Sequence, residues 1–491
     1  KTCCIFWMET RRVAGFERRL TIGLICCVAA IDSADFAMVP GMMKAFEDDF
    51  GARLSDIGIM YLLQTLVGAL SLPVWGHLGD RFSRKGLLSF GCLIWGILTT
   101  LGASATSFNY FIVFRTAAVI FMSILSPLIQ SIVADLAPSE RRGQLFGIIG
   151  SAEASGGLIG AFIATAVAEE SIGSIRGWRV CLWVVGTLSV AFAFILAVFM
   201  TEPPRENDTI KPRNYHPTAN KTVVDWETMK LPTFWLLVLQ GVFGCIPWNA
   251  YGMYSPLWME LIGYTPLQVA FIGSAGRLAN VFSGIFAGFL GDWSHRCLPY
   301  HGRLLCAEAS VLFGMTWMTI MLVWIPKDSA DHLYLFAGIY MAFSLTATWT
   351  PNSTNRPMIA DIVPTWARAS VFSIFCMAER VPSSFAGYFV SFLAESQFGY
   401  HKPDVEQLSD AGRAANVRAL STALALMTSI PWILCIFTYS SMHFTYNGDV
   451  QKTARRVAQT KQIAYKIVDP EDADEGDAEK CLLAKAKKVL E

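Results

Sequence analysis

The stretch GHLGDRFSRKG, residues 76–86, places an aspartate after two glycines and before a cluster of basic residues. A shorter version, GFLGDWSHR, returns at residues 288–296. An aspartate can accept hydrogen bonds from the free amides at a helix N-terminus, and basic side chains can bridge to neighbouring helix ends. We therefore predict a clasp that holds one conformation and releases in another. The residues assigned to this conformational clasp are Gly76, Asp80, Arg81, Arg84, Lys85 and Asp292.

The two stretches belong to a longer internal repeat. ADLAPSERRGQLFGIIGSAE at 134–153 returns as ADIVPTWARASVFSIFCMAE at 360–379. The two copies share eight residues in twenty positions, namely Ala, Asp, Pro, Arg, Phe, Ile, Ala and Glu. Roughly one or two identities would arise by chance at average residue usage. The chain is therefore expected to contain two copies of one structural unit.

The composition is that of a membrane protein. Of the 491 residues, 53% are hydrophobic and only 16% are charged, and the mean hydropathy is +0.42. Soluble domains carry about 25% charged residues. The apolar residues fall in runs of roughly 20, long enough to cross a bilayer as helices. Twelve such spans are predicted, at 20–43, 54–78, 86–105, 109–134, 143–168, 180–200, 233–258, 266–290, 304–325, 332–357, 369–395 and 418–441.

A polar, proline-containing stretch at 202–231 separates six spans from six. The predicted fold is therefore an all-α membrane protein with twelve transmembrane helices in two parallel six-helix repeats. The tails, this linker and the loops on their side hold more Lys and Arg than the opposite loops, which places both termini in the cytosol. The predicted parts are a cytosolic tail 1–19, a bundle 20–201, a cytosolic linker 202–231, a second bundle 232–441 and a cytosolic tail 442–491. The acidic DPEDADEGDAEK in the last part predicts disorder followed by a short helix.

Several functional classes find no support in the sequence. A net charge of +0 gives no basis for binding nucleic acid. The 12 cysteines are scattered and form no CxxC, so neither a metal site nor a disulfide framework is expected. The chain carries no GxSxG, HExxH or P-loop motif, so we expect no enzyme activity, no cofactor and no ATP-driven transport by this chain alone.

Charged residues inside the predicted spans are the candidate coupling residues. Glu153 and Glu379 end the two copies of the repeat, each eleven residues after an arginine that marks the cytosolic end. Eleven helical residues rise about 16 Å, which places both carboxylates near the middle of the bilayer. A charge there costs on the order of 3 kcal/mol, so it normally faces a cavity or a partner. The full set is Asp32, Asp35, Arg115, Glu153, Arg277 and Glu379.

These motifs resemble those of the major facilitator superfamily, and within it the Spinster-like branch. The pattern shared with that branch is Asp32 and Pro40 in the first span, GHLGDRFSRK, Arg115, Ala134-Asp135-Leu136 and Glu202-Pro203-Pro204-Arg205. Two positions depart from it. The acidic residue of the fourth span is Met122 here, and the Asp-Arg pair of the first span reads Asp32-Ser33. The resemblance implies substrate binding between the halves, and Spinster-like proteins are associated with export of lysolipids and sphingoid lipids.

In this superfamily, spans one, four, seven and ten usually line the substrate cavity. The resemblance therefore implies that Asp32 or Asp35 takes up a proton beside Arg115, which also meets an anionic substrate group. The alternative is a purely structural pair of one of these aspartates with Arg115 or Gln64. Glu153 and Glu379 are either proton sites or parts of a state-dependent latch, such as a Glu153–Arg277 bridge. Both interpretations stay open on the sequence alone.

Spans seven and ten contribute polar and aromatic side chains to the predicted cavity. Gly244, Pro247, Gly252 and Pro256 interrupt regular helix in span seven and can free backbone groups toward a cavity. The alternative for the aromatic residues is packing and anchoring at the membrane interface. The residues assigned to the substrate cavity are Trp248, Asn249, Tyr251, Trp349, Asn352 and Asn355.

The sequence thus predicts a secondary transporter that works by alternating access, is linked to protons, and carries a lipid-like or amphipathic organic anion. One alternative is a carrier of a small polar metabolite, such as an organic acid or a sugar phosphate. Another is a membrane sensor or structural subunit without transport. The expected partners are membrane lipids, protons and the substrate, and the expected form is a multi-pass monomer in a membrane that the sequence does not specify.

Overall fold

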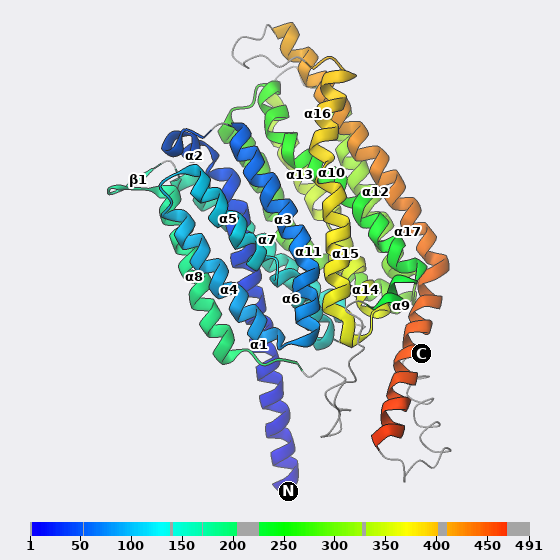
Figure 1. The fold of residues 1–491 in the computed structure, drawn as a ribbon. Coiled ribbons are helices and arrows are strands. Elements are labelled where there is room, and N and C mark those ends of the chain that lie inside the picture. The colour runs from blue at the N-terminus through cyan, green and yellow to red at the C-terminus, as the bar shows by residue number, and fades with distance from the viewer. Residues whose placement is uncertain are drawn as a thin grey trace.

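The computed structural model describes residues 2–52, 54–137, 141–168, 170–203, 225–326, 330–400 and 410–468. Helices dominate these ranges, and one short antiparallel hairpin joins two of them. The first half contains α1 (Thr2–Gly41), α2 (Met43–Phe50), α3 (Leu54–Arg81), α4 (Arg84–Ala103), α5 (Phe108–Met122), α6 (Leu125–Leu136), α7 (Arg142–Val167), β1 (Ser171–Ile172), β2 (Ile175–Arg176) and α8 (Gly177–Phe199). Figure 1 shows this half in blue to teal beside the second half in green to orange.

The second half repeats the plan with more interruptions. It contains α9 (Trp226–Met229), α10 (Pro232–Ile262), α11 (Pro266–Cys297), α12 (Gly302–Thr319), α13 (Leu333–Thr346), α14 (Arg356–Ile362), α15 (Arg368–Ser383), α16 (Ala386–Ser396) and α17 (Asp410–Val468). Short π-helical turns at Ile320–Trp324 and Pro351–Asn355 and 3-10 turns at Ala330–His332 and Thr365–Ala367 connect them. By length and composition, eleven helices of the described ranges could cross a membrane.

The predicted span 369–395 is the one that those eleven leave out. It is broken between α15 and α16 at Ser384 and Phe385, just after Pro382, so neither piece reaches the length of a span. A proline inside a helix removes a backbone hydrogen bond and favours such a break. Figure 1 shows α15 and α16 following one another along the bundle, so together they make the remaining crossing.

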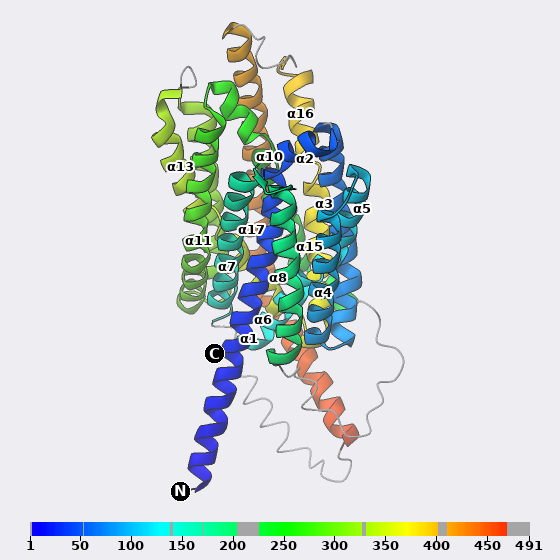
Figure 2. The same ribbon diagram turned by 90° about the vertical axis from the view of Figure 1, so that its left-hand side faces the viewer.

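Both ends of the described chain leave the bundle on the same side, here called the terminal end (Figures 1 and 2). The β1–β2 hairpin lies at the opposite end, here called the far end. Helix α1 already begins at Thr2, so residues 2–19 of the predicted tail continue the first span as helix.

Helix α17 also runs past the predicted end of its span and reaches Val468, so residues 442–468 are helical. Contacts hold this extension against the second half. Asp449 accepts hydrogen bonds from the amide and hydroxyl of Thr233 at 3.0 and 2.8 Å, and Arg456 pairs with Asp225. The acidic stretch predicted to be disordered begins at residue 469 and lies outside the described residues.

Glycines on α7 allow two neighbouring helices to come close. A Cβ atom on Gly156 would lie 1.9 Å from the carbonyl oxygen of Ala30 on α1. A Cβ atom on Gly147 would lie 2.3 Å from the carbonyl oxygen of Gly284 on α11. Small residues at four-residue spacing are a common way for membrane helices to pack. Helix α7 therefore packs against α1 within its own half and against α11 in the other half.

The two halves meet along two helix pairs, α7 with α11 and α3 with α15. Within the first half, α4 packs on α5 and α8; within the second, α17 packs on α10 and α12. Most of the buried apolar side chains of both halves form one continuous core, and Ala287, Cys306 and Trp349 form a small second cluster. The space between the halves is therefore bordered by the helices that carry the repeated motifs.

Candidate functional site: a clasp and a charged group between the halves

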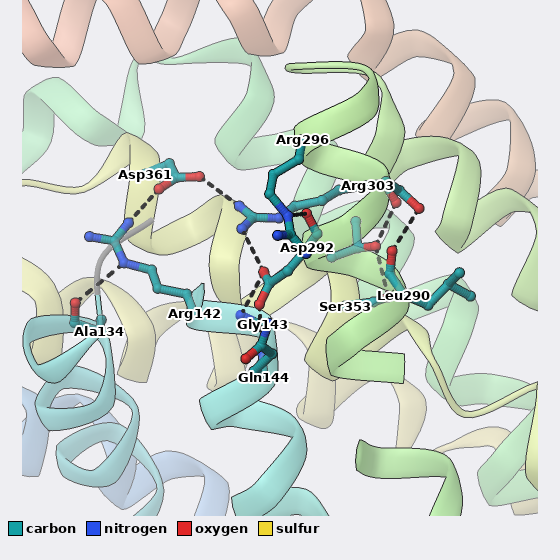
Figure 3. A network of polar contacts seen from close by, with 12 residues as sticks. Ala134, Arg142, Gly143, Gln144, Leu290, Asp292, Arg296, Arg303, Ser353 and Asp361 are labelled. Carbon is teal, nitrogen blue, oxygen red and sulfur yellow. Dashed lines mark hydrogen bonds and ion pairs between the residues drawn. The ribbon is translucent and has the colours of Figure 1, made fainter. Parts of the chain in front are cut away.

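Asp292 on α11 fastens the start of α7 at the terminal end. Its carboxylate accepts hydrogen bonds from the backbone amides of Gly143 at 3.0 Å and Gln144 at 2.8 Å (Figure 3). The side chain is fully buried, and Arg303 lies 3.2 Å from the same carboxylate. An acidic group is favourable at a helix N-terminus because the first amides there have no partner within the helix.

Asp80 on α3 makes the equivalent contact in the opposite direction. Its two oxygens accept hydrogen bonds from the amides of Ala369 at 3.0 Å and Ser370 at 2.9 Å, at the start of α15. One aspartate of each half therefore accepts hydrogen bonds from the amides at a helix N-terminus of the other half. Because the two contacts cross between the halves, they hold the terminal end closed.

Two arginine–aspartate pairs also cross between the halves beside these contacts. Arg142 of the first half pairs with Asp361 of the second, which also lies 3.0 Å from Arg303 (Figure 3). In the mirror arrangement, Arg368 of the second half pairs with Asp135 of the first, and Asp135 lies 2.6 Å from Arg84. Truncating one partner of such a buried pair leaves the other charge uncompensated, which is costly.

Three of the six predicted clasp residues, Gly76, Asp80 and Asp292, thus make inter-half contacts, and Arg84 joins the same network through Asp135 of its own half. Gly76 packs against α15, where an added Cβ would lie 2.2 Å from the hydroxyl of Ser373. Asp80, Asp292 and Arg84 belong to the network described above. Arg81 is exposed and Lys85 is half-buried, and neither forms an ion pair with any other described residue.

Sequence reasoning did not assign five members of this network, which are Asp135, Arg142, Arg303, Asp361 and Arg368. Four of them were visible as identities in the repeat at 134–153 and 360–379. Conservation of an aspartate and an arginine between the two copies was the available signal, and it pointed to a shared contact. The repeat could not identify Arg303, because Arg303 lies outside both repeated stretches.

Asp35 and Arg115 form a fully buried pair inside the first half. The guanidinium lies 2.9 Å from one carboxylate oxygen, and the indole N–H of Trp95 donates to the other at 2.7 Å. Arg115 also approaches the hydroxyl of Thr99 at 3.5 Å. The predicted pairing of Arg115 with Asp35 is therefore present in this conformation, whereas the buried Gln64 forms no hydrogen bond with either residue in the described part of the chain.

A second charged group lies at mid-span, between the halves. Glu153 of α7 lies 3.7 Å from Arg356 at the start of α14, with 37% and 20% of their side chains exposed. Arg356 also donates a hydrogen bond to Asn352 at 3.0 Å. The predicted Glu153–Arg277 bridge is not formed in this structure. Arg277 is exposed on α11 and pairs with no carboxylate of the described chain.

Asp32, Glu379 and Arg380 complete this mid-span group. None of the three makes a side-chain hydrogen bond or ion pair within the described residues. The charges of Glu153 and Arg380 nevertheless act on Asp32, and those of Arg380 and Arg356 act on Glu379. Asp32 and Glu379 are half-buried and Arg380 is exposed, although all three lie in spans. We name Asp32, Glu153, Arg356, Glu379 and Arg380 the mid-span group.

The predicted cavity residues divide into two sets. Tyr251 and Trp349 are buried by packing against other aromatic rings. The Tyr251 ring packs at a tilt against Tyr340, and the Trp349 ring lies between Phe286 and Phe313. Their ring surfaces are covered by neighbouring helices of the same half. Trp248 likewise packs on Phe343, with ring centroids 4.8 Å apart.

The three asparagines have polar contacts. Asn352 is the one that reaches the mid-span group, through Arg356. Asn355 accepts a hydrogen bond from Tyr439 at 2.7 Å and donates one to Gln240 at 3.4 Å. Asn249 donates to the carbonyl of Ser383 at 3.2 Å, beside the break between α15 and α16. The polar face of span ten therefore holds Arg356 in place.

Comparison with known proteins identifies the family. The model of the Major Facilitator Superfamily matches residues 25–387. The chain is similar to Protein spinster of Drosophila melanogaster, with 22% identity over 422 residues that cover 83% of this chain and 66% of that protein. It is also similar to Quinolone resistance protein NorA of Staphylococcus aureus (strain COL), with 21% identity over 308 residues that cover 63% of this chain and 74% of that protein. The chain thus spans about two thirds of the length of spinster.

Two solved structures share the fold. A bacterial homologue of the human lysosomal transporter Spinster, inward-facing and unoccupied, superposes with a TM-score of 0.59 at 16% identity over 88% of this chain and 98% of its own. The proton:xylose symporter XylE bound to 6-bromo-6-deoxy-D-glucose superposes with a TM-score of 0.62 at 15% identity over 85% and 96%. The predicted fold class and the predicted resemblance to Spinster-like proteins are both confirmed.

Proposed function

This chain belongs to the major facilitator superfamily, a family of membrane transporters, and we propose that it is a proton-linked secondary transporter of a lipid-like or amphipathic organic anion. The mid-span group carries this proposal. Its members come from α1, α7, α14 and α15, so both halves contribute charges to one place between them. Charged side chains at this depth are costly and are retained where they bind or move something.

The position of the clasp supports the proposed alternating access. The contacts of Asp80, Asp292 and the two arginine–aspartate pairs close the terminal end in this conformation. Release of those contacts would separate α3 from α15 and α7 from α11 and open the mid-span group to the terminal end. In such a cycle the two halves rock about a fixed site near the bilayer midplane.

The charge balance of the mid-span group supports the proposed proton linkage. Three carboxylates face two guanidiniums, so the group carries one surplus negative charge when all members are ionised. Such a surplus is unfavourable in a poorly hydrated site, and uptake of one proton removes it. Asp32 and Glu379 are the candidates for that proton, because Glu153 is paired with Arg356. Asp35 lies outside this group and is a separate candidate for the coupled proton, since protonation would release Arg115.

Arg380 is the proposed anchor for the anionic group of the substrate. Its guanidinium is exposed in the middle of the bundle, and no hydrogen bond or ion pair to another described residue occupies it. A guanidinium binds carboxylate and phosphate groups through paired hydrogen bonds. The resemblance to spinster supports a lipid-like substrate. A small polar metabolite is the second candidate, favoured by Met122 in place of the acidic residue and by Asn352 beside Arg356.

We further propose that the terminal end faces the cytosol, with the tails 1–19 and 442–491 and the linker 202–231 on that side. Six spans then lie in 20–201 and six in 232–441. The excess of Lys and Arg on the terminal side supports this orientation.

The test is uptake by the purified full chain in liposomes under an imposed pH gradient, with a lysolipid and a panel of small organic anions offered separately. We expect gradient-driven movement of the lysolipid, and its loss in Asp32→Asn or Glu379→Gln with substrate exchange retained. Glu260→Gln is the matched control, because Glu260 is an exposed carboxylate on α10 away from the mid-span group. Movement of a small polar anion alone would replace the lipid assignment, and equal uptake with and without the gradient would contradict proton linkage.

A further inference from the structure

A cavity of about 450 Å³ lies at the far end of the first half, apart from the clasp and the mid-span group. Its lining residues come from the β1–β2 hairpin, α2, the end of α4 and the start of α8. Figure 1 shows the hairpin and α2 near one another at this end of the bundle. Its lining is polar on the hairpin side and includes one tryptophan. The lining residues are Asp49, Ser104, Ser171, Gly173, Ser174, Ile175, Arg176, Arg179 and Trp183.

Arg179 is a structural member of this lining, because its donors are already used. It lies 2.9 Å from Asp49 and donates hydrogen bonds to the carbonyls of Ala103 at 2.9 Å and Ala105 at 2.8 Å. Its guanidinium also rests over the ring of Trp178, 4.4 Å from the centroid. Arg179 therefore fixes the cavity wall rather than offering a free donor to a ligand.

Arg176 differs from Arg179 in its contacts. It forms one long ion pair within the described residues, with its Nε 3.8 Å from Asp49, and 46% of the side chain is exposed. Its two terminal amino groups make no hydrogen bond within the described chain. The hydroxyls of Ser171 and Ser174 are equally unoccupied and line the same cavity. With two arginines and one aspartate, the lining carries one surplus positive charge.

An apolar surface that faces the membrane begins where this polar cavity ends. Leu101 lies one turn before Ser104 on α4, and Val184 follows Trp183 on α8; both are exposed. The two helices pack closely, because a Cβ on Gly96 would lie 2.6 Å from the carbonyl of Gly186. An amphipathic molecule with its head in the cavity could therefore lay its chains along α4 and α8.

We propose that this cavity binds the phosphate headgroup of an anionic phospholipid in the far leaflet. The phosphate accepts hydrogen bonds from the free amino groups of Arg176 and from the serine hydroxyls, and the acyl chains lie over Leu101 and Val184. The surplus positive charge suits a headgroup with one net negative charge. Trp183 lies between the polar and apolar parts, as tryptophans at membrane interfaces do. The site is independent of the proposed transport function.

The test measures lipid binding to the purified full chain by native mass spectrometry during titration with phosphatidylglycerol or phosphatidylcholine. We expect phosphatidylglycerol to bind more tightly, and Arg176→Gln to weaken that binding roughly fivefold, the effect of one arginine near a lipid headgroup. Arg418→Gln is the matched control, because Arg418 is exposed near the start of α17 at the same end. Photoactivatable phosphatidylglycerol should crosslink to peptides containing Leu101 or Val184, and less so in Arg176→Gln.

Three outcomes would overturn the proposal. Equal binding of phosphatidylglycerol by the Arg176→Gln variant and the parent chain would remove Arg176 from any lipid site. An equal loss in Arg418→Gln would show attraction by the surface as a whole instead of a site. Competition by inorganic phosphate at the same concentration as the lipid would show a site for a free anion, in which the apolar surface has no part.

Discussion

Arg356 is one of the residues at which the two repeats differ in charge. It stands four residues before the repeated Ala-Asp of the second copy, where the first copy has Gln130. Both side chains face the other half: Gln130 lies 3.8 Å from the sulfur of Cys376 on α15, and Arg356 lies 3.7 Å from Glu153 on α7. The second copy therefore supplies a bridging charge that the first copy lacks, and Glu379 has no equivalent partner from the first half.

We predict that Arg356→Gln favours opening of the terminal end, because it leaves Glu153 without its partner. The pair is partly exposed, so its coupling energy should be about 0.2–1 kcal/mol. A double-mutant cycle with Glu153→Gln, read by hydrogen exchange at the Gly143 and Gln144 amides, measures this coupling. Strictly additive effects of the two changes would show that the ion pair contributes nothing to closure.

Asp35 has a structural role that Asp32 does not share, although the sequence presented them as equivalent. We predict that Asp35→Asn lowers the free energy of unfolding by about 3–5 kcal/mol, because Arg115 would remain buried without a counter-charge. Asp32→Asn is the matched control and should leave stability nearly unchanged. Thermal unfolding of the purified protein in detergent makes the comparison. Similar melting temperatures for both variants would contradict the assignment of Asp35 to a stabilising pair.

The helices were predictable as spans, but their interruptions were not. Hydropathy and run length located twelve apolar segments, and all correspond to helix in the structure. The break at Ser384 follows Pro382, a local signal that hydropathy and run length do not use. The π-helical turn at Pro351–Asn355 is held by a contact from another helix, the hydrogen bond from Tyr439 to Asn355. The extension of α17 likewise depends on Thr233 and Asp225, which are more than 200 residues away in the chain. A local hydrophobic pattern does not identify contact partners that are distant in the sequence.

At the element scale, we predict that Gly288→Ala weakens the packing of α7 on α11. An added Cβ would lie 2.2 Å from the carbonyl oxygen of Gly143, so the helices must separate. Overpacking of this kind costs about 1–3 kcal/mol. Hydrogen exchange of the Gly143 and Gln144 amides should accelerate about tenfold or more. Gly273→Ala is the matched control on the same helix, since an added Cβ there meets nothing within 4 Å. Equal exchange in both variants would contradict the role of this contact.

Each half of the molecule contributes an equivalent set of clasp contacts, but alignment of the two sequences identifies only some of the residues that make them. Asp80 and Asp292 occupy matching positions in GHLGD and GFLGD. In both sequences an arginine follows four residues later, Arg84 in the first half and Arg296 in the second. In the structure, however, the counterpart of Arg84 is Arg303, because Arg303 pairs with both Asp292 and Asp361. The chain between α11 and α12 is longer than that between α3 and α4, so spatial equivalence shifts along the sequence.

If the two crossing contacts act as one clasp, breaking either should loosen both. We predict that Asp292→Ala accelerates exchange at Gly143 and Gln144 and also at Ala369 and Ser370, and that Asp80→Ala does the same. Hydrogen bonds to a charged acceptor contribute about 1.5–3 kcal/mol, so acceleration by about tenfold or more is expected at the site of the change.

The double variant distinguishes a shared clasp from two separate ones. Once Asp292→Ala has opened the terminal end, adding Asp80→Ala should have less effect than it has alone, because the halves have already separated there. Asp331→Ala is the matched control, since Asp331 is exposed just before α13, away from the clasp. Acceleration confined to the amides that each aspartate contacts, with additive effects in the double variant, would mean two independent latches. Coupled acceleration would mean that the pseudo-symmetric halves open at the terminal end as rigid bodies.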